Sequence, residues 1–538
     1  MGYLRATAAL CTLFLLGVLA PTQPAAQTDG PRERTLVVAY PPQQFSLDPL
    51  HTFSTTEAQL FTAVYEGLVA YDPITLNPVA GQAERWEISR DRRIYTFYLR
   101  PDARFSNGDQ LRAEDFRQSW LRILDPGAAA EYSFLFDVIE GVAEYRSGEL
   151  SDPNQVGIRT LGDKVLEVEL AEPADHFLKV LAHHSFSAIH SGYIGALNWD
   201  RAGQMIGNGP FRVTSWTDRE LRLERNEYYW GRSQVELDRV VVRFYEDPQE
   251  ITRRFLAGEI HWANNWANSA ELRPYLVANP LFATTYFYFR SDREPFDDER
   301  VRSGLALLLP WHQIRSPETA YFPSDTLVPD IADYPEVVGI REQDIRRGLQ
   351  LLSKAGYGGG RGLPPINIKV AAGGVQVRRV AEIMQEAWEG QLGVEVAVQE
   401  FPYRDLIEEV RAGDFILAHQ TWVGDFADPL TFLQMWTRSS NLNDAGYFNR
   451  QYDRMVTRAL RTGGSERLPA LASAEAMLLE EAVILPISHM VAFNLVSRGR
   501  LDGWYPNALD IHPFRFIRFK RLEGPRGVAG APPPAPAG

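Results

Sequence analysis

The feature that most constrains the fold is an alternation of helical and extended patterns in the second half of the chain. A helical pattern at 345–352 is followed by a strand pattern at 366–370. A second helical pattern at 375–388 is followed by a strand pattern at 394–398. Such alternation is typical of βαβ units and a sheet with parallel strands. We therefore predict an α/β region between about 286 and 497.

The first half of the chain shows the same two patterns in a different order. Apolar residues are spaced helically at 57–68, and residues 85–100 alternate around a polar break, which predicts a hairpin. Apolar positions within 114–124 recur at helical spacing and predict a helix that packs one face. A strand pair is expected at 211–224, after a turn rich in Gly and Pro. We expect a separate α/β region over 71–205.

Length and charge restrict the class of protein further. With 538 residues the chain is too long for one compact core, so we expect two or three lobes. The formal net charge is −14, and it becomes −15 if Arg5 leaves with a signal segment. An acidic balance argues against nucleic acid or anionic lipid as a partner, because both bind basic patches. It fits a ligand with an ammonium group, and a solvated acidic surface explains it equally well.

The first 26 residues have the pattern of a secretory signal peptide. Arg5 precedes an apolar run from Ala6 to Ala20, and Pro24-Ala-Ala26 offers small residues for cleavage. An uncleaved membrane anchor is the alternative. Cys11 is the only cysteine and would leave with this segment, so we expect neither a disulfide nor a thiolate site. Since no cysteine stands at the cleavage site for lipid attachment, we expect a soluble periplasmic protein.

One acidic residue stands out in a loop that contains glycine and aromatic residues. Asp425 lies within the segment Gln420–Leu433, just before a helix start. Asp428 and Pro429 fit the N-cap and the first position of that helix, because a carboxylate accepts an unpaired N–H and proline needs no donor there. Asp425 has no such local role and is a candidate for binding a small cation in a cleft. A surface turn is the alternative on spacing alone.

The chain lacks the short motifs of the commonest hydrolases and nucleotide-binding proteins. It has no G-x-S-x-G, no H-E-x-x-H and no G-K-[ST] segment. His183 and His184 are adjacent, and such neighbours are poorly placed to share a metal ion, so we expect a structural or exposed role for them. The two carboxylates of a glycoside hydrolase come together only in the fold, so the sequence does not exclude this activity.

Aromatic residues make up 12% of the chain and gather partly in loops. The segment 261–269 places Trp262 and Trp266 beside several amide side chains. These residue types offer flat apolar walls and hydrogen-bonding groups to a peptide or a sugar. Packing of the rings at an interface between lobes is the alternative.

Short segments also follow one another in a recognisable order. They are Ser46-Leu-Asp-Pro49, Tyr65-Glu-Gly-Leu68, Trp86 ahead of Tyr95-Thr-Phe-Tyr-Leu-Arg100, Phe105-Ser-Asn-Gly108, Asn208-Gly-Pro-Phe211, Asn226-Glu-Tyr-Tyr-Trp230, Gly258-Glu-Ile260 and Phe296-Asp-Asp-Glu-Arg-Val-Arg302. In this order they give residues 35–520 a resemblance to the periplasmic oligopeptide-binding proteins. These are the peptide/nickel class of solute-binding components of ABC transporters.

The resemblance implies a set of ligand-binding residues. Asp425 matches the family carboxylate that receives the α-ammonium of a bound peptide, and Trp422 beside it lines a side-chain pocket. Thr421 and Val423 match residues whose backbone groups pair with the extended ligand. Thr55 matches a counterpart from the opposite lobe. A peptide would then be held like an added β-strand.

Other matched positions are polar, or depart from the family pattern. Asn265 falls on a polar position that faces the cleft. His419 stands where a carboxylate-binding arginine is expected, and Phe53 stands where an acid occurs. The segment Leu309-Pro-Trp-His312 lacks the usual Asp-Arg pair. The way in which the C-terminus of the ligand is recognised is therefore open.

The resemblance implies an α/β fold of the periplasmic-binding-protein-like type II, with two α/β lobes, an additional inserted domain and a hinge between lobes. We expect a disordered tail at 524–538 and the following lobe bounds: lobe I at 28–70, 206–285 and 498–523, inserted lobe II at 71–205 and lobe III at 286–497.

The expected function is capture of oligopeptides between lobes I and III, with delivery to a membrane permease. The permease and its ATPase would be separate chains, and this chain is expected to be a monomer without catalytic activity, cofactor, metal or nucleic-acid partner. An oligosaccharide, a nickel chelate or an opine in the same fold is the nearest alternative. A secreted hydrolase is a more distant one.

Overall fold

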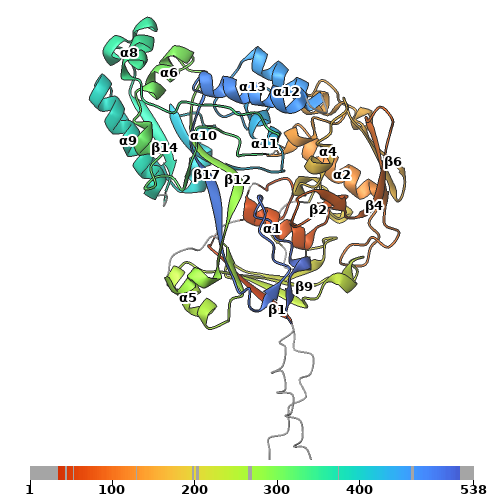
Figure 1. Cartoon of the computed structure of the whole chain (residues 1–538). Coiled ribbons are helices and arrows are strands. Elements are labelled where there is room, and N and C mark those ends of the chain that lie inside the picture. Colours follow the sequence, from red (N-terminus) through yellow and green to blue (C-terminus); the bar gives the residue numbers. More distant parts are fainter. Residues whose placement is uncertain are drawn as a thin grey trace, which may run out of the picture. The chain divides into compact units, whose positions relative to one another are not determined.

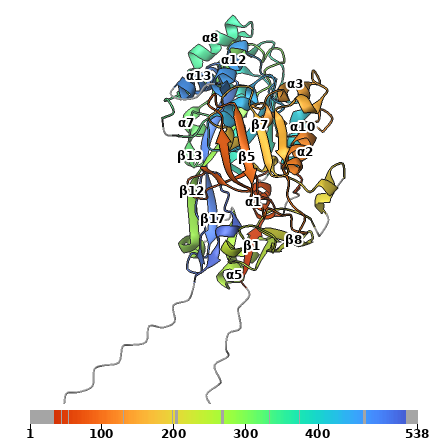
Figure 2. The same ribbon diagram turned by 90° about the vertical axis from the view of Figure 1, so that its right-hand side faces the viewer.

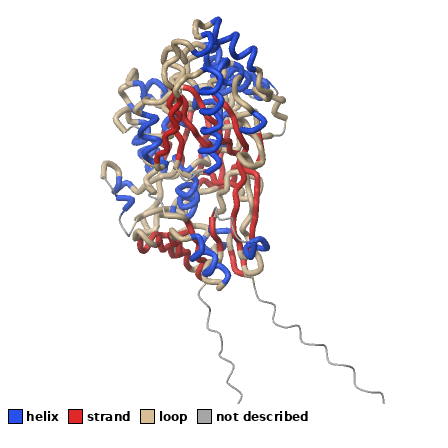
Figure 3. Tube along the Cα trace, turned by 90° about the vertical axis from the view of Figure 1, so that its left-hand side faces the viewer, coloured by secondary structure: helices blue, strands red, loops and turns tan. Residues whose placement is uncertain are grey.

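Two long antiparallel strands, β12 (Leu276–Phe289) and β17 (Ile484–Val496), lie side by side in the middle of one large sheet. They are seen in Figure 1 and as long red strands in Figure 3. Beyond β17 follow the strands that we call the β1 half: β11 (Trp262–Asn264), β1 (Thr35–Tyr40), β10 (Arg239–Phe244), β9 (Glu220–Arg225) and β8 (Phe211–Trp216). Beyond β12 follow the strands that we call the β14 half: β16 (Leu417–Val423), β14 (Ile366–Ala371) and β15 (Val396–Phe401). The short strand β13 (Phe322–Pro323) pairs with β17.

This computed structural model describes residues 34–42, 45–52, 54–128, 130–196, 199–201, 205–264, 270–331, 333–372, 375–461 and 466–520. All of them belong to one compact unit that begins at Arg34. The predicted signal peptide with Cys11 and the predicted tail at 524–538 lie outside the described residues.

A second, antiparallel sheet has the strand order β4-β5-β7-β6, with α2 packed against β6 and β7 (Figure 2). The predicted hairpin is confirmed as β4 and β5, and Tyr95, Phe97 and Leu99 are buried on one face. The remaining strands form two small pairs. The strands of these sheets are β4 (Ala83–Ile88), β5 (Ile94–Leu99), β6 (Ile158–Gly162) and β7 (Val165–Glu169), then β2 (Val69–Tyr71) with β3 (Pro78–Ala80), and β18 (Leu501–Asp502) with β19 (Arg518–Phe519).

The α-helices alternate with strands mainly in the β14 half, as predicted. Helix α9 packs on β14 and β15, and α8 comes directly before β14 in the α/β alternation. The helices are α1 (Thr55–Val64), α2 (Ala113–Leu124), α3 (Val142–Ser147), α4 (Phe177–Leu181), α5 (Pro248–Leu256), α6 (Glu299–Leu307), α7 (Trp311–Ile314), α8 (Ile345–Lys354), α9 (Val375–Leu392), α10 (Tyr403–Arg411), α11 (Leu430–Leu433), α12 (Arg450–Arg461) and α13 (Arg467–Glu480).

The parallel pairing expected of the alternating segment is present. β14 pairs in parallel with β15 and, over a shorter stretch, with β16. Because helices and strands mix in this way, the predicted α/β class is confirmed. The division of the chain into lobes at the bounds given above stays a prediction.

The helix predicted at 57–68 ends earlier than its apolar pattern. The last helical residue of α1 is Val64, and Tyr65 adopts an extended conformation. The side chain of Asn208 then supplies the hydrogen bonds that a further helical turn would have made to Glu66. Its Oδ1 accepts the N–H of Glu66, and its Nδ2 donates to the carbonyl of the same residue. Gly209 lies so close that a Cβ there would stand 2.6 Å from the backbone nitrogen of Tyr65. Tertiary contacts therefore end this helix.

One apolar core joins the four-stranded sheet to the β14 half. Phe97 and Trp120 of the four-stranded region belong to the same buried cluster as Tyr286 of β12 and Ala418 of β16. The predicted packing face of α2, which includes Trp120, is thus confirmed as core. Burial of large apolar groups across the two regions holds them together in this structure.

Candidate functional site

Asp425 lies in the loop between β16 and α11, and its side chain is only 5% exposed. Thr431 of α11 fixes it from within the loop: Thr431 Oγ1 donates to Asp425 Oδ2 at 3.1 Å and accepts the N–H of Asp425 at 2.9 Å. Gly424 just before it packs tightly, since a Cβ there would approach the Phe282 ring to 2.6 Å. The local sequence therefore directs the carboxylate inward, not into bulk water.

Side chains from a distant part of the sequence surround the same carboxylate. The hydroxyl of Tyr132 donates to the Asp425 side chain, and the hydroxyl of Tyr71 donates to the Asp425 backbone carbonyl at 3.1 Å. His183 Nε2 lies 3.8 Å from Asp425 Oδ1. Because His183 Nδ1 accepts the N–H of Ser185, the neutral ring carries its proton on Nε2, which faces the carboxylate.

The electrostatic state of Asp425 follows from these contacts. Burial raises the pKa of Asp425 to about 7, and the hydrogen bonds from Tyr132 and Thr431 offset this only in part. The carboxylate thus contacts hydroxyl groups, the N–H of its own backbone and His183, whose pKa burial lowers well below its ordinary value. A buried carboxylate beside hydroxyls and a neutral imidazole gains much from an arriving cation.

A pocket of about 240 Å³ opens beside Asp425. Four of the predicted ligand-binding residues line it together with Asp425: Thr55, Thr421, Trp422 and Val423. Its other lining residues are Ser54, Ala58, Tyr71, Tyr132, His183, His184, Tyr403, Gln420, Gly424, Leu509 and Ile511. The fold therefore brings the first turn of α1 and the end of β16 to one cavity, although these segments are far apart in the chain.

The end of β16 presents one strand edge to this pocket. Pairing between β14 and β16 extends to Lys369 and Ala418, while β12 pairs with β16 as far as Val423. The N–H of Gly424 donates to Phe282 of the β12 strand at 2.8 Å. Backbone groups alternate in direction along an antiparallel strand, so every second residue before Gly424 also bonds to β12. The backbone groups of the residues between them, Thr421 and Val423, therefore point to the pocket side.

The remaining predicted residues lie elsewhere or outside the described chain. His419 is buried on β16 against the ring of Phe287, and burial lowers its pKa to about 4. Trp262 requires a correction: it is fully buried, its indole N–H donates to Asn494 Oδ1, and it packs in the core of the β1 half instead of walling the cleft. Trp262 is buried because it lies on β11, between β17 and β1, where apolar side chains such as Tyr40 and Phe514 cover it. Phe53 and Asn265 lie outside the described residues.

Asp428 is structural, as predicted, but the prediction that it is the N-cap of the helix is wrong. Its Oδ1 accepts the N–H of Leu430, although the cap position itself is taken by Pro429. Both of its oxygens also accept hydrogen bonds from Arg467, at 2.8 and 2.6 Å. The sequence pattern did not reveal this buried ion pair, because its two members stand 39 residues apart.

Tyr71, Tyr132 and His183 are site residues that the sequence reasoning missed. His183 and His184 were noticed as an adjacent pair and expected to be structural or exposed; His183 is buried and His184 is half-buried, their ring centroids lie 3.9 Å apart, and both line the pocket. Tyr132 precedes a 3-10 helix, Ser133–Phe136, which is too short to show a periodic pattern in the sequence.

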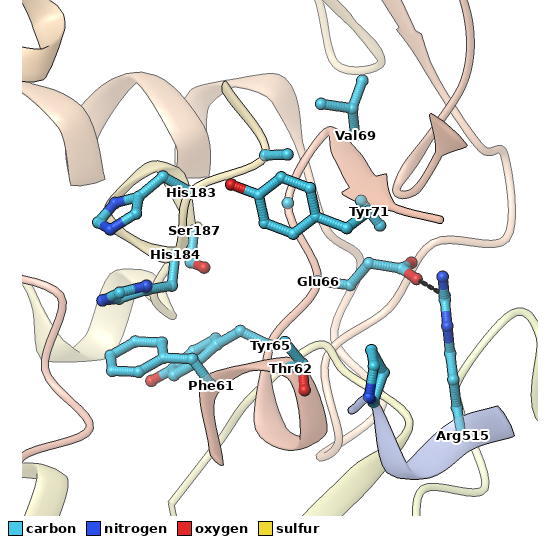
Figure 4. A pocket seen from close by; sticks show the side chains of 14 residues that line it. Phe61, Thr62, Tyr65, Glu66, Val69, Tyr71, His183, His184, Ser187 and Arg515 are labelled. Atoms are coloured by element: carbon cyan, nitrogen blue, oxygen red, sulfur yellow. Dashed lines mark hydrogen bonds and ion pairs between the residues drawn. The ribbon is translucent and has the colours of Figure 1, made fainter. Parts of the chain in front are cut away.

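A smaller cavity of about 50 Å³ shares Tyr71, His183 and His184 with this pocket (Figure 4). Its far side is formed by Glu66, which accepts hydrogen bonds from Arg515 and from the Tyr229 hydroxyl. Glu66 is therefore paired with a cation of the chain, Arg515. Among the described residues, no Lys or Arg side chain contacts Asp425 in this way.

Two features of the described residues bear on other classes of function. None of the described helices has the length and apolar character needed to cross a membrane. No cluster of three or more His, Cys, Asp or Glu side chains in the described part of the chain is arranged to hold a metal ion.

Known proteins resemble this chain over most of its length. The periplasmic oligopeptide-binding protein OppA of Escherichia coli (strain K12) is 28% identical over 502 residues, covering 89% of this chain and 91% of that protein. The dipeptide-binding protein DppE of Bacillus subtilis (strain 168) is 28% identical over 486 residues, covering 86% of this chain and 87% of that protein.

A solved structure gives the same result for the fold. The murein tripeptide binding protein MppA of Escherichia coli is 25% identical and superposes with a TM-score of 0.82 over 91% of this chain and 99% of that one. Its unliganded open form superposes with a TM-score of 0.64 over 91% of this chain and 98% of that one.

The family itself is given by a third comparison. The model of bacterial extracellular solute-binding proteins, family 5 Middle, matches residues 77–444, which is more than half of the chain. The fold agrees, because the large sheet and the added four-stranded sheet superpose on a protein of this kind. This chain belongs to the bacterial extracellular solute-binding proteins of family 5.

Proposed function

We propose that this protein captures oligopeptides in the pocket beside Asp425 and delivers them to a membrane permease of an ABC transporter. One observation carries the proposal: a buried carboxylate in contact with hydroxyls and a neutral imidazole stands at the end of a strand edge that faces a pocket. A peptide offers the two groups that fit, an ammonium at its N-terminus and a ladder of N–H and C=O groups behind it.

The peptide lies along β16 as an additional strand. Backbone groups of Thr421 and Val423 point toward it, and Thr55 at the start of α1 faces the same cavity from the other side. Trp422 forms part of the wall for a side chain. Every peptide presents the same pattern of backbone N–H and C=O groups. This arrangement therefore binds the backbone specifically and tolerates many different side chains.

The ammonium contact with Asp425 fixes the register of the ligand. A charge-assisted hydrogen bond of this kind contributes about 1.5–3 kcal/mol. It also removes the cost of leaving the Asp425 carboxylate ionised and unpartnered in a buried place, so ionisation of Asp425 and ligand binding favour one another.

Transport follows from movement of the lobes. We propose the lobe bounds given under Sequence analysis, with the ligand enclosed when the lobes approach and a closed surface then presented to the permease subunits. The names of OppA and DppE describe peptide-binding proteins, and that of OppA a periplasmic one. In this proposal the chain acts outside the cytoplasm as a monomer and does not alter its ligand.

Titration calorimetry with pentaalanine and with N-acetyl-pentaalanine tests the proposal. Acetylation removes the positive charge and keeps the backbone pattern, so we expect at least about tenfold weaker binding of the acetylated peptide. Equal binding of both forms, or binding of neither form, contradicts the proposal.

Mass spectrometry of the peptide recovered after prolonged incubation separates binding from catalysis. We expect the peptide to be recovered intact. Appearance of fragments with the wild-type protein, and not with a heat-denatured control, would point to the hydrolase alternative.

A further inference from the structure

The ionisable groups that line the pocket beside Asp425 have an uneven charge. Asp425 carries the carboxylate, and the other ionisable lining residues in the described chain are three tyrosines and two histidines: Tyr71, Tyr132, Tyr403, His183 and His184. Burial raises the pKa of the tyrosines and lowers the pKa of the histidines, so these groups are neutral near pH 7. The pocket is therefore negative when Asp425 is ionised.

The start of α1 does not reverse this charge, although a helix N-terminus attracts anions. Ser54 and Glu57 form a capping box: Ser54 Oγ accepts the N–H of Glu57, and Glu57 Oε2 accepts the N–H of Ser54 at 2.8 Å. Glu57 also accepts the N–H of Ser46 at 2.7 Å. A carboxylate of the chain itself thus already occupies the end of α1 that faces the pocket.

Further back on β16, position 419 carries a histidine, and the nearby Lys369 on β14 already pairs with Glu409 at 2.7 Å. His419 stands six positions before Asp425 on β16, which is about 20 Å along an extended chain. It is buried against Phe287, and its imidazole is neutral near pH 7 because burial lowers its pKa to about 4. His419 does not line the pocket, so it offers no positive charge to a ligand carboxylate.

We infer that the pocket selects peptides whose C-terminal carboxylate lies well away from Asp425, and that it accepts short peptides only when their C-terminus carries no charge. This inference rests on the proposed function, in which Asp425 holds the ammonium. The carboxylate of a dipeptide lies within about 7 Å of its ammonium, because an extended residue spans about 3.3–3.6 Å. At that distance in a buried pocket, repulsion from Asp425 is strong. In a pentapeptide the separation exceeds about 15 Å, and the repulsion is weak.

The names of related proteins leave this question open, because they differ in the ligand that they state. OppA is called an oligopeptide-binding protein, DppE a dipeptide-binding protein and MppA a murein tripeptide-binding protein. Membership of the family therefore does not set the length of the ligand. The negative charge of the pocket in this chain favours longer peptides, or short peptides with an amidated C-terminus.

Calorimetry with four ligands at pH 7.5 tests the inference on the wild-type protein: dialanine and pentaalanine, each as free acid and as C-terminal amide. We expect amidation to tighten binding of the dipeptide by at least about tenfold and to change binding of the pentapeptide by less than about threefold. A dipeptide acid that binds as tightly as its amide overturns the inference. So does a dipeptide amide that fails to displace bound pentapeptide.

These outcomes are distinct from failure of the proposed function. If pentaalanine binds and the dipeptide pattern is absent, only the selection by charge is wrong. If neither peptide binds in either form, the proposed function fails, and this inference fails with it.

A variant of Gln420 tests the physical cause. Gln420 lines the pocket, and Gln420→Lys adds the positive charge that the described lining lacks. We expect this variant to bind dialanine acid at least about tenfold more tightly than the wild type does, so that the advantage of the amide is lost. Gln420→Met is the matched comparison with a similar volume and no charge, so a change that both variants show is assigned to loss of the Gln420 amide, and only the difference between them is assigned to the added charge. An unchanged preference in a folded Gln420→Lys protein overturns the electrostatic explanation.

Discussion

Asp425 and Asp428 lie in the same loop, and their side chains are 5% and 7% exposed, yet their surroundings are opposite. Asp428 accepts two hydrogen bonds from Arg467, and these outweigh the effect of burial, so its pKa is lowered. Asp425 meets hydroxyls and a neutral imidazole, and burial raises its pKa to about 7.

The difference shows how a fold separates a structural charge from a binding charge. A buried carboxylate that pairs with a cation of the same chain needs no further partner, and removing either member leaves the other charge buried and unpaired. A buried carboxylate without a cation in contact costs free energy until a ligand supplies one. Burial by itself therefore says little about function, and the identity of the partner says much more.

Breaking the Asp428 pair should have the largest effect. Asp428→Ala leaves the Arg467 guanidinium buried without its carboxylate, and we expect the free energy of unfolding to fall by about 3–5 kcal/mol. Urea denaturation followed by fluorescence measures the loss. The control is the double variant Asp428→Leu with Arg467→Met, which should recover much of the stability because both charges are gone. A loss below about 1 kcal/mol for the single variant would show that the pair is not structural.

Asp425→Asn should have the opposite profile. The amide keeps the volume and removes the charge, so the free energy of unfolding at pH 8 should stay the same or rise. Peptide affinity should fall by about tenfold to a hundredfold, because the charge-assisted bond is lost. Calorimetry and urea denaturation of one preparation measure both quantities. If the variant is destabilised as strongly as Asp428→Ala and still binds peptide normally, the comparison between the two aspartates fails.

The two aspartates should also respond to pH with opposite sign. Between about pH 4 and pH 7 the folded chain keeps a proton on Asp425 that the unfolded chain has released, so this residue's contribution to stability falls as pH rises and is constant above about pH 7. The Asp428 pair stabilises the fold above the unfolded pKa of about 4, and this contribution is lost as pH falls through its lowered folded pKa. Stability of each variant relative to the wild type at pH 5 and pH 8 measures these slopes.

Ligand binding sharpens the same test. At pH 6 an arriving ammonium should ionise Asp425 and release close to one proton, so the calorimetric heat should depend on the ionisation heat of the buffer. In Asp425→Asn this dependence should vanish. Identical heats for the wild type in phosphate and imidazole buffers would show that Asp425 is already ionised, or does not contact the ligand.

The smallest effect is expected from a pair that joins two regions. Arg411 of α10 contacts Glu131 at 2.5 Å, and Asn441 donates to the backbone carbonyls of residues 130 and 131. Because Arg411 is 47% exposed, Arg411→Gln should weaken binding of every peptide by only about twofold to threefold. The control Arg254→Gln breaks an exposed pair with Glu250 within α5 and should leave affinity unchanged. A loss that depends on the peptide sequence would place Arg411 in contact with ligand instead.

The extent to which the sequence predicted the site differs from one residue to the next. The hydrogen bond of Asp428 at the helix start was readable from one short segment, because helix-start preferences act over a few residues. The binding role of Asp425 came from the family resemblance, since spacing alone fitted a surface turn. The prediction that Trp262 lines the cleft was wrong because a tryptophan among amides has the same sequence pattern in a loop and on a covered strand. Its neighbours in space, which the sequence does not give, place it in the core.

Local periodicity by itself determined the α/β class, the hairpin of β4 and β5 and the alternation of helices and strands around β14, since these depend on which face of a segment is apolar. The tertiary structure alone decided that Tyr132 and His183 reach Asp425 and that Arg467 reaches Asp428. Those contacts set which buried carboxylate has a cation beside it. Electrostatic partners are chosen by distance in space, and a linear pattern carries no record of that distance.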